Sequence, residues 1–121
     1  MATIMTVDDT ASMRQMISFT LNSVGYEVIQ AGDGAEALKL AKDRKVDLVI
    51  CDVNMPNMNG IDMVAKAKQS PKNAALPIIM LTTEGQPQLV ERAKKAGARG
   101  WIVKPFKNEL LVAAVRKLVG N

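Results

Sequence analysis

Apolar positions along the chain recur with two different periods. Five short runs of aliphatic and β-branched residues are each followed by a segment in which apolar residues return every three or four positions. Continuous apolar runs are typical of strands covered on both faces, and the longer spacing is typical of amphipathic helices. The sequence predicts strands at Thr3–Val7, Tyr26–Ile29, Leu48–Cys51, Leu76–Leu81 and Gly100–Val103.

A helix is expected after each of these strands. Gly25 suits the end of the first helix, and Asp33-Gly34-Ala35-Glu36 resembles a capping box at the start of the second. The turn-forming tract Pro56–Gly60 precedes the third helix, which should end near Ser70. The residues predicted to face inward are Met13, Met16, Ile17, Thr20, Leu21, Val24, Ala37, Leu38, Ala41, Ile61, Val64, Ala67, Leu89, Val90, Ala93, Ala96, Leu110, Leu111, Ala114, Val115 and Leu118.

This alternation of strand and helix predicts one α/β domain that spans residues 1–121. Strand–helix–strand units make right-handed crossovers, so the five strands should form a parallel sheet with helices on both faces. The chain has 121 residues, 48% of them hydrophobic, and no linker or low-complexity tract interrupts the alternation. That length suits a single hydrophobic core.

Composition excludes several kinds of chemistry. The chain has no histidine, so Ser-His-Asp triads and imidazole metal sites are impossible. Its one cysteine, Cys51, cannot form an internal disulfide and is expected to be a small buried hydrophobe. Any bound metal should therefore be a hard cation held by oxygen ligands, with Mg²⁺ the leading candidate.

Charge and hydropathy bear on location and partners. The formal net charge is +4, but acids and bases alternate along most of the chain, so we expect no nucleic-acid binding. No basic and then apolar leader precedes Asp8, and no apolar run approaches the roughly 18 residues that a membrane span needs. The sequence favours a cytoplasmic protein that does not bind membranes.

Reactive side chains follow the predicted strands. Asp8-Asp9 comes after the first strand, Asp52 after the third, Thr82 after the fourth and Lys104 after the fifth. The carboxyl ends of parallel strands share one edge, where α/β sheets bind their ligands. If the first and third strands are neighbours, three carboxylates crowd together, and a divalent cation would relieve their repulsion.

These residue types suit phosphoryl transfer. A carboxylate can act as a nucleophile and form an acyl phosphate, and the remaining task is to position and neutralise the phosphoryl group. Asp52 is the candidate nucleophile, Lys104 offers an opposing positive charge, and the Thr82 hydroxyl can donate to a phosphoryl oxygen.

Simpler interpretations stand beside these. Asp8 and Asp9 could only cap the first helix, since acids favour helix N-termini. Thr82 could cap the fourth helix, Lys104-Pro105 could be only a turn, and Trp101 could be a half-buried core residue. A metal hydrolase is disfavoured because the chain has no glycine-rich phosphate loop.

Taken together, these motifs resemble the response-regulator receiver domains of two-component systems, and within that family the single-domain chemotaxis regulators of the CheY type. The resemblance covers essentially the whole chain and rests on Asp8-Asp9, on Asp52 before Asn54-Met55-Pro56 and Gly60, on Thr82, and on Lys104-Pro105-Phe106. It implies a doubly wound, flavodoxin-like α/β fold with strand order 2-1-3-4-5 and five helices. It also implies a cis peptide bond before Pro105.

The resemblance assigns a role to each residue. Asp52 would be phosphorylated by a histidine kinase or by acetyl phosphate. Mg²⁺ would be bound by the Asp9 and Asp52 side chains, by the Asn54 backbone carbonyl and, through water, by Asp8. Thr82 and Lys104 would contact the phosphoryl oxygens.

The resemblance also implies a switch. Thr82 would move toward the phosphoryl group, and the aromatic residue of the fifth strand would turn inward; here that residue is Trp101, where chemotaxis regulators often have tyrosine. Asn54 and Glu84 would set the lifetime of the phosphorylated form, which we expect to be short.

The implied function is that of a signalling switch and not of an enzyme. The only reactions it would catalyse are its own Mg²⁺-dependent phosphorylation from a phospho-donor and its own dephosphorylation. A chemotaxis-type histidine kinase would act on it, a phosphatase is possible, and a monomer is expected. A target protein such as a flagellar-switch component would bind the face formed by the fourth helix, fifth strand and fifth helix. Two alternatives remain: a phosphorelay intermediate, and an interaction module that needs no phosphate. The basic residues that could dock an acidic target are Arg92, Lys94, Lys95, Arg99, Lys104, Lys107, Arg116 and Lys117.

Overall fold

The computed structural model describes residues 2–83 and 87–119, which form five strands, five α-helices and one short 3-10 helix. The strands are β1 (Thr3–Val7), β2 (Glu27–Ala31), β3 (Leu48–Asp52), β4 (Ile78–Thr82) and β5 (Gly100–Val103). The helices are α1 (Ala11–Asn22), α2 (Gly34–Asp43), α3 (Gly60–Lys68), the 3-10 helix η1 (Pro71–Asn73), α4 (Pro87–Ala96) and α5 (Asn108–Val119).

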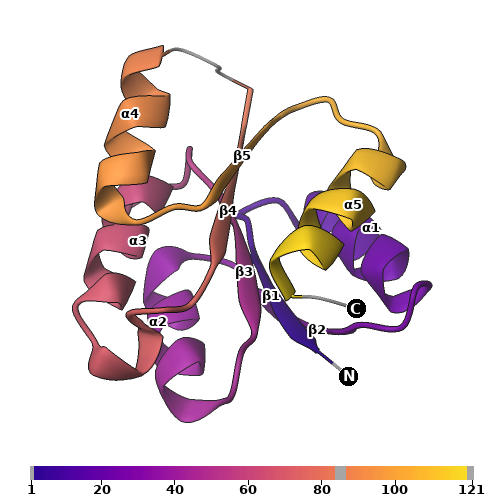
Figure 1. Ribbon diagram of the computed structural model, residues 1–121, viewed down its shortest axis with the longest axis horizontal. Helices are drawn as coiled ribbons and strands as arrows, with labels where there is room; N and C mark the ends of the chain where they lie inside the picture. The colour runs from indigo at the N-terminus through magenta and orange to yellow at the C-terminus, as the bar shows by residue number, and fades with distance from the viewer. Residues whose placement is uncertain (1, 84–86, 120–121) are drawn as a thin grey trace.

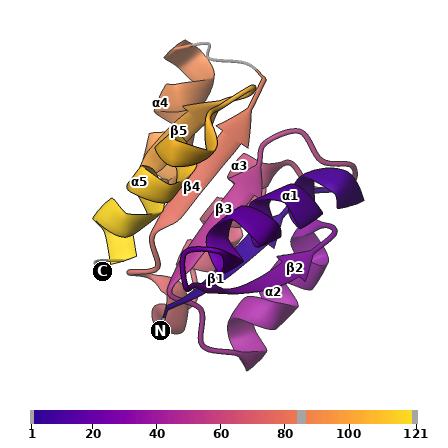
Figure 2. The ribbon, with the colours of Figure 1, turned by 90° about the vertical axis from the view of Figure 1, so that its right-hand side faces the viewer.

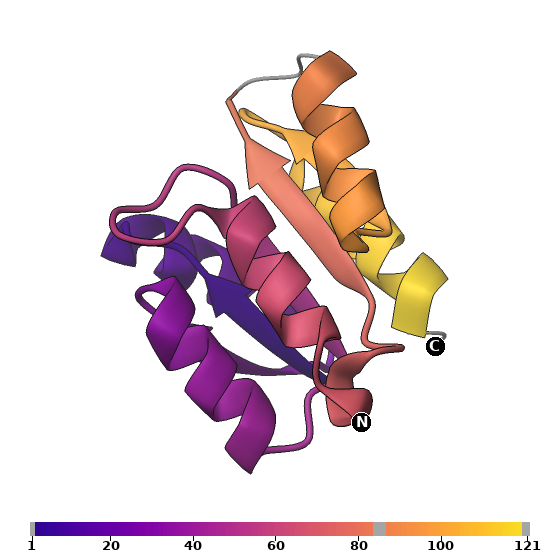
Figure 3. The same cartoon turned by 90° about the vertical axis from the view of Figure 1, so that its left-hand side faces the viewer.

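The five strands form one parallel sheet in the order β2-β1-β3-β4-β5, which confirms the predicted fold class and strand order. Seen nearly along its edge, the sheet separates two layers of helices (Figure 1). Helices α1 and α5 cover one face (Figure 2), and α2, α3 and α4 cover the other (Figure 3). Each connection thus crosses over the sheet, as the alternation of strand and helix requires.

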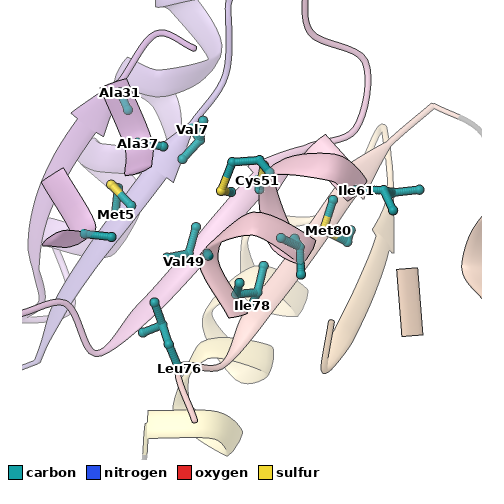
Figure 4. Close-up of a cluster of buried hydrophobic side chains, with 14 of the residues drawn as sticks. Met5, Val7, Ala31, Ala37, Val49, Cys51, Ile61, Leu76, Ile78 and Met80 are labelled. Carbon is teal, nitrogen blue, oxygen red and sulfur yellow. The ribbon is translucent and has the colours of Figure 1, made fainter. Parts of the chain in front are cut away.

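The middle strand, β3, is buried along its whole length, and its alternating side chains enter two separate cores. Val49 and Cys51 belong to the core beneath α2, α3 and α4, together with Met5 and Met80 (Figure 4). Leu48 and Ile50 belong to the core beneath α1 and α5. A strand buried on both faces needs apolar residues at consecutive positions, which explains its unbroken apolar run.

Two helices begin at side-chain caps. Asp33 accepts a hydrogen bond from the Glu36 backbone N–H (2.8 Å), and Asn59 accepts one from the Ile61 N–H (2.7 Å). Glu36 reaches back, as the capping box predicts, but its carboxylate accepts from the Gly32 N–H at 2.6 Å, one residue before the cap. Both caps satisfy backbone donors that the first turn of a helix leaves unpaired.

Some local expectations were wrong. Leu110 and Met16 were expected to face inward, but Leu110 is 54% exposed and Met16 39% exposed. In each helix the neighbouring Leu111 and Ile17 are fully buried, so the buried face lies one position further along. Strand β2 begins after Tyr26 and runs to Ala31, and β4 begins only after Pro77.

Two further observations concern the chain as a whole. The Lys104–Pro105 peptide bond is cis, as the family resemblance implied. Of the helices in the described ranges 2–83 and 87–119, none is both long enough and apolar enough to cross a membrane.

Candidate functional site

The three acids predicted to converge do so at the carboxyl edge of the sheet. Val7 of β1 pairs with Cys51 of β3, so the residues that follow each of them, Asp8 and Asp52, lie side by side. One carboxylate oxygen from each of Asp8, Asp9 and Asp52 lies within 4.8 Å of the other two. The sheet order produces this cluster, because it places β1 next to β3.

Lys104 reaches the same cluster from the end of β5. Its Nζ lies 3.3 Å from Asp8 Oδ2 and 3.4 Å from Asp52 Oδ1, and only 15% of its side chain is exposed. The Lys104 backbone N–H donates to the Thr82 carbonyl at 2.7 Å, which fixes the start of the loop after β5. One ammonium therefore faces two carboxylates, and the cluster of four charged groups keeps a net negative charge.

Burial controls the electrostatics of this cluster. Asp8 is 1% exposed and Asp52 is 6% exposed, whereas Asp9 is exposed. Burial raises the pKa of the Asp52 carboxyl and the charge of Asp8 raises it further, while Lys104 and a hydrogen bond from the Asn54 backbone act in the opposite direction. The pKa of Asp52 is raised on balance, so Lys104 alone does not compensate for loss of solvent and the neighbouring acid.

The loop after Asp52 is held against the strand by a close approach of backbone to backbone. The Val53 N–H donates to Leu81 O at 3.0 Å, and the Gly60 N–H donates back to Val53 O at 2.9 Å. A Cβ atom on Gly60 would lie 2.1 Å from the Asp52 carbonyl oxygen. Only glycine fits there, so Gly60 fixes the backbone that carries Asp52; from sequence it could be recognised only as a turn residue.

Asp8 is positioned by contacts on both sides. Its N–H donates to Ala31 O of β2 (3.1 Å), and its Oδ1 accepts from the N–H of Thr10 (2.8 Å), the residue before the first turn of α1. Helix α1 begins without a side-chain cap, so the simpler interpretation that Asp8 only caps this helix is not confirmed. Arg14 donates to the Asp8 carbonyl oxygen and to the Gln30 side chain (3.3 Å). Nothing in the sequence indicated this function for Arg14.

Thr82 and Trp101 lie on neighbouring strands and face the same side of the sheet. Thr82 is fully buried at the end of β4 and pairs with Val103, while Trp101 pairs with Met80 two positions earlier. Trp101 is half-buried against the core beneath α2, α3 and α4. Within the described ranges, its buried Nε1 has no hydrogen-bond partner.

Space surrounds the Trp101 ring. It lines a cavity of about 80 Å³ shared with Val90 and Lys94 of α4, and another of about 250 Å³ shared with Leu110 and Lys117 of α5. Trp101 therefore borders unfilled space next to both α4 and α5. A change of its rotamer would meet less resistance here than in a close-packed core.

The remaining predicted residues differ in how far the structure describes them. Asn54 is exposed, two residues beyond Asp52, and its backbone acts to lower the pKa of the Asp52 carboxyl. Glu84 lies outside the described residues. Cys51 is fully buried; burial, and after it the charges of Asp52 and Asp8, raise the pKa of its thiol, so it is not a nucleophile here.

The donor set fits a hard divalent cation. Three carboxylates in one place, two of them buried, would repel one another without a cation, and the exposed Asp9 leaves the cluster open on one side. Mg²⁺ binds oxygen ligands and keeps several of its waters, so a partly open cluster suits it.

Comparison with known proteins agrees with this site. The response regulator receiver domain family matches residues 4–116. Chemotaxis protein CheY1 of Helicobacter pylori is 41% identical over 120 residues, which cover 98% of this chain and 97% of that protein. Chemotaxis protein CheY of Thermotoga maritima is 40% identical over 116 residues, 95% of each.

Solved structures show the same likeness, and one relative has a different kind of name. The chemotaxis response regulator CheY4 of Vibrio cholerae superposes with a TM-score of 0.94 at 44% identity, over 98% of both chains. The transcriptional regulatory protein PdtaR of Mycobacterium tuberculosis is 43% identical over 98% of this chain, but the match spans only 57% of PdtaR. Sequences similar to this chain therefore occur both in proteins named for chemotaxis and in a protein named for transcriptional regulation.

Proposed function

Since the chain belongs to the response regulator receiver family and is CheY-like, we propose that it is a signalling switch operated by phosphorylation of Asp52. One observation carries this proposal. The Asp52 carboxylate lies 3.4 Å from the Lys104 ammonium, in the same cluster as Asp8 and Asp9. A nucleophile, a positive charge and cation ligands thus share one edge of the sheet.

The chemistry follows from these groups. A carboxylate oxygen of Asp52 attacks the phosphorus of the donor, and the bond from phosphorus to the leaving group breaks. The leaving group is the imidazole of a phosphohistidine in a kinase, or acetate when the donor is acetyl phosphate. Lys104 balances the charge on the phosphoryl oxygens, and the Thr82 hydroxyl donates to one of them. Hydrolysis of the same acyl phosphate resets the switch.

Mg²⁺ supplies the remaining charge neutralisation when it is bound. We propose that Asp9 and Asp52 bind it directly, that Asp8 binds it through water, and that the Asn54 carbonyl completes the protein ligands. Asn54 and Glu84 would in addition control access of water to the acyl phosphate and so its lifetime.

The output is binding to another protein. Movement of Thr82 toward the phosphoryl group vacates space on the side of the sheet that Trp101 faces, and the indole, which borders two cavities, can turn inward. That motion alters the surface of α4, β5 and α5, whose exposed basic residues suit an acidic target segment. The residues are Arg92, Lys94, Lys95, Arg99, Lys107, Arg116 and Lys117.

The relatives support a chemotaxis pathway. Several of them are named chemotaxis proteins, and they match this chain over almost their whole length. We therefore propose that the chain works in the cytoplasm, is phosphorylated by a chemotaxis-type histidine kinase, and signals to a target such as a flagellar-switch component.

Phosphorylation by acetyl phosphate tests the proposal directly. With Mg²⁺ present, the intact protein should gain the mass of one phosphoryl group, and the fluorescence of Trp101, the only tryptophan, should change. Asp52→Asn should gain no mass, and its Trp101 fluorescence should not change. When Mg²⁺ is removed by a chelator, the wild type should likewise gain no mass and show no change in fluorescence. An unlabelled wild type would contradict the switch, and transfer of the label to a histidine-bearing protein would instead indicate a relay.

A further inference from the structure

Asp9 is the exposed acid of the cluster at the sheet edge, and only its backbone holds it in place. Within residues 2–83 and 87–119, its side chain makes no hydrogen bond or ion pair. Its carboxylate nevertheless lies in the cluster with those of Asp8 and Asp52. The position of this proposed cation ligand therefore depends on the peptide unit that joins Asp8 to Asp9.

Arg14, in the first turn of α1, holds that peptide unit. Its Nη1 donates to the carbonyl oxygen of Asp8 at 2.5 Å. Because a peptide unit is planar, a contact that fixes its oxygen also fixes the direction of the bond that leads to the Cα of Asp9. The rest of Asp8 is fixed by the Ala31 carbonyl (3.1 Å) and the Thr10 N–H (2.8 Å), so Arg14 supplies the last contact that the acid pair needs.

Arg14 is itself anchored on its other side. Helix α1 and strand β2 lie side by side (Figure 2), and Arg14 Nε donates to Gln30 Oε1 of β2 at 3.3 Å. The guanidinium also passes close to the loop after β2, since a Cβ atom on Gly32 would lie 3.6 Å from Nη1. The planar guanidinium directs two donors at once, which a single ammonium cannot do.

We propose that Arg14 is a positioning residue that holds Asp8 and Asp9 in the geometry that Mg²⁺ requires, and that it thereby sets the preference of the site for Mg²⁺ over Ca²⁺. This inference rests on the proposed function, in which Asp9 and Asp52 bind the cation. Mg²⁺ demands near-ideal octahedral geometry, whereas Ca²⁺ accepts oxygen ligands in more variable number and arrangement. A carboxylate that loses its fixed direction should therefore cost the site more affinity for Mg²⁺ than for Ca²⁺.

The charge of Arg14 alone would have the opposite effect. A guanidinium beside a cation site repels the cation, so its removal would strengthen the binding of any divalent cation. Mg²⁺ and Ca²⁺ carry the same charge, so this effect would not distinguish them. A contact that only stabilised the fold would change the melting temperature and leave both affinities of the folded protein unchanged. The direction of the change, and its difference between the two ions, therefore identify a positioning role.

Isothermal titration of the metal-free protein with Mg²⁺ and with Ca²⁺ measures both affinities. Arg14→Met keeps most of the apolar stem of the side chain and removes its donors. It should bind Mg²⁺ about tenfold or more weakly than the wild type, as loss of an outer-shell partner does, and its Ca²⁺ affinity should fall by a clearly smaller factor. Arg14→Lys can still donate to the Asp8 carbonyl, but not to Gln30 at the same time, and should recover part of the Mg²⁺ affinity.

Arg44→Met is the matched control. Arg44 also reaches β2, but it pairs with Glu27 (3.5 Å), at the opposite end of the strand from Ala31 and Asp8. Its replacement removes the same charge and should leave both affinities unchanged.

Gln30→Met tests the path through Arg14. It removes only the second anchor of the guanidinium and should weaken Mg²⁺ binding less than Arg14→Met does. Added to Arg14→Met, it should weaken binding no further, because Gln30 acts through Arg14. If Arg14→Met does not fold, Gln30→Met and Arg14→Lys apply the same test. An unchanged ratio of Mg²⁺ to Ca²⁺ affinity in both would overturn the inference.

Phosphorylation by acetyl phosphate separates this inference from the proposed function. Arg14→Met should reach the wild-type rate once Mg²⁺ is raised to saturation, because Asp52 and Lys104 are unchanged. A wild type that binds Mg²⁺ and is phosphorylated, beside an Arg14→Met variant that binds Mg²⁺ as tightly or more tightly, would overturn the inference alone. Equal loss of affinity for the two ions would do the same. A wild type that binds no Mg²⁺ and gains no phosphoryl group would overturn the proposed function and this inference with it.

Discussion

At the scale of single residues, the electrostatics of Asp52 connect the fold to the chemistry. Burial and the charge of Asp8 both raise the pKa of its carboxyl, and Lys104 opposes them only in part. The ionised form that the proposed nucleophile needs is therefore less favoured at Asp52 than in a solvent-exposed aspartate. A divalent cation would reverse this balance, because it stabilises the carboxylate directly.

The raised pKa has a consequence for stability that can be measured. A carboxyl whose pKa is higher in the folded state stabilises the fold below its unfolded pKa, about 3.9, and this stability is lost as pH rises through the folded value. In the presence of a chelator, Asp52→Asn should therefore be more stable than the wild type, by a margin that grows as pH rises from about 4 toward neutrality. Urea denaturation at several pH values measures this margin. A margin that shrinks with rising pH would mean that attraction by Lys104 outweighs burial.

Gly60 offers a second test at this scale. Alanine at this position would place its Cβ 2.1 Å from the Asp52 carbonyl oxygen, and that backbone cannot move without moving Asp52. We expect Gly60→Ala to cost about 2–3 kcal/mol of unfolding free energy, as overpacking does. It should also weaken Mg²⁺ binding, because Asp52, one of the proposed ligands, is displaced.

Gly34 provides the matched control for Gly60. Both glycines are the first residue of a helix, but a Cβ on Gly34 would meet the Met58 side chain, whose sulfur can move away. Gly34→Ala should cost less than Gly60→Ala in chemical denaturation and should leave Mg²⁺ affinity unchanged. Equal losses in both variants would show that the backbone near Asp52 tolerates the extra carbon.

At the scale of elements, the start of α2 depends on its cap. The Asp33 side chain accepts a hydrogen bond from the Glu36 backbone N–H at 2.8 Å. Removal of this cap leaves that backbone donor unpaired. Asp33→Ala should lower the free energy of unfolding by about 1 kcal/mol, measured by thermal denaturation. Lys39→Ala, on the exposed side of the same helix, should change it by less than about 0.5 kcal/mol. If Asp33→Ala and Lys39→Ala changed the free energy of unfolding by similar amounts, the stabilisation could not be assigned to the cap.

The sequence was most informative about which elements exist and least informative about how helices rotate. Unbroken apolar runs of this length, such as Leu48–Cys51, are typical of strands covered on both faces, and the structure confirms this one as part of β3. Leu110 and Leu111 are adjacent apolar residues, and the period alone did not decide which of them is buried. The choice depends on where α5 meets the sheet, which is a tertiary contact.

Glycine and proline positions set limits on elements more reliably than apolar positions did. Gly25 and Gly97 both have positive φ, at 98° and 117°, and each follows a helix, as the sequence predicted for Gly25. The short helix η1 at Pro71–Asn73 was missed, because three residues are too few to show a period.

At the scale of the whole molecule, the site depends on strand order, which no single segment contains. Asp8-Asp9 and Asp52 are far apart in sequence, and they meet only because β1 lies between β2 and β3. The types of residue at the strand ends predicted the cluster, and the family resemblance supplied the order. The supporting contacts of Arg14 and Gly60 could not be predicted, because they depend on backbone atoms brought together by folding.

Binding of Mg²⁺ should therefore stabilise the entire fold, because its proposed ligands come from two strands that only the folded sheet brings together. A ligand that binds the folded state alone at ten times its dissociation constant adds about 1.4 kcal/mol to the free energy of unfolding. Titration of Mg²⁺ into metal-free protein should raise the melting temperature in proportion to the logarithm of its concentration once the site is saturated.

Asp9→Asn is the cleanest variant for this titration. Asp9 is exposed, so its replacement leaves no unpaired group in the core, yet its carboxylate belongs to the cluster. The variant should keep the wild-type melting temperature without metal and lose most of the increase that Mg²⁺ causes. Asp43→Asn, an exposed acid at the end of α2, should keep that increase. If Mg²⁺ stabilised wild type and Asp9→Asn equally, the cation would be bound elsewhere, and the three acids at the sheet edge would need another explanation.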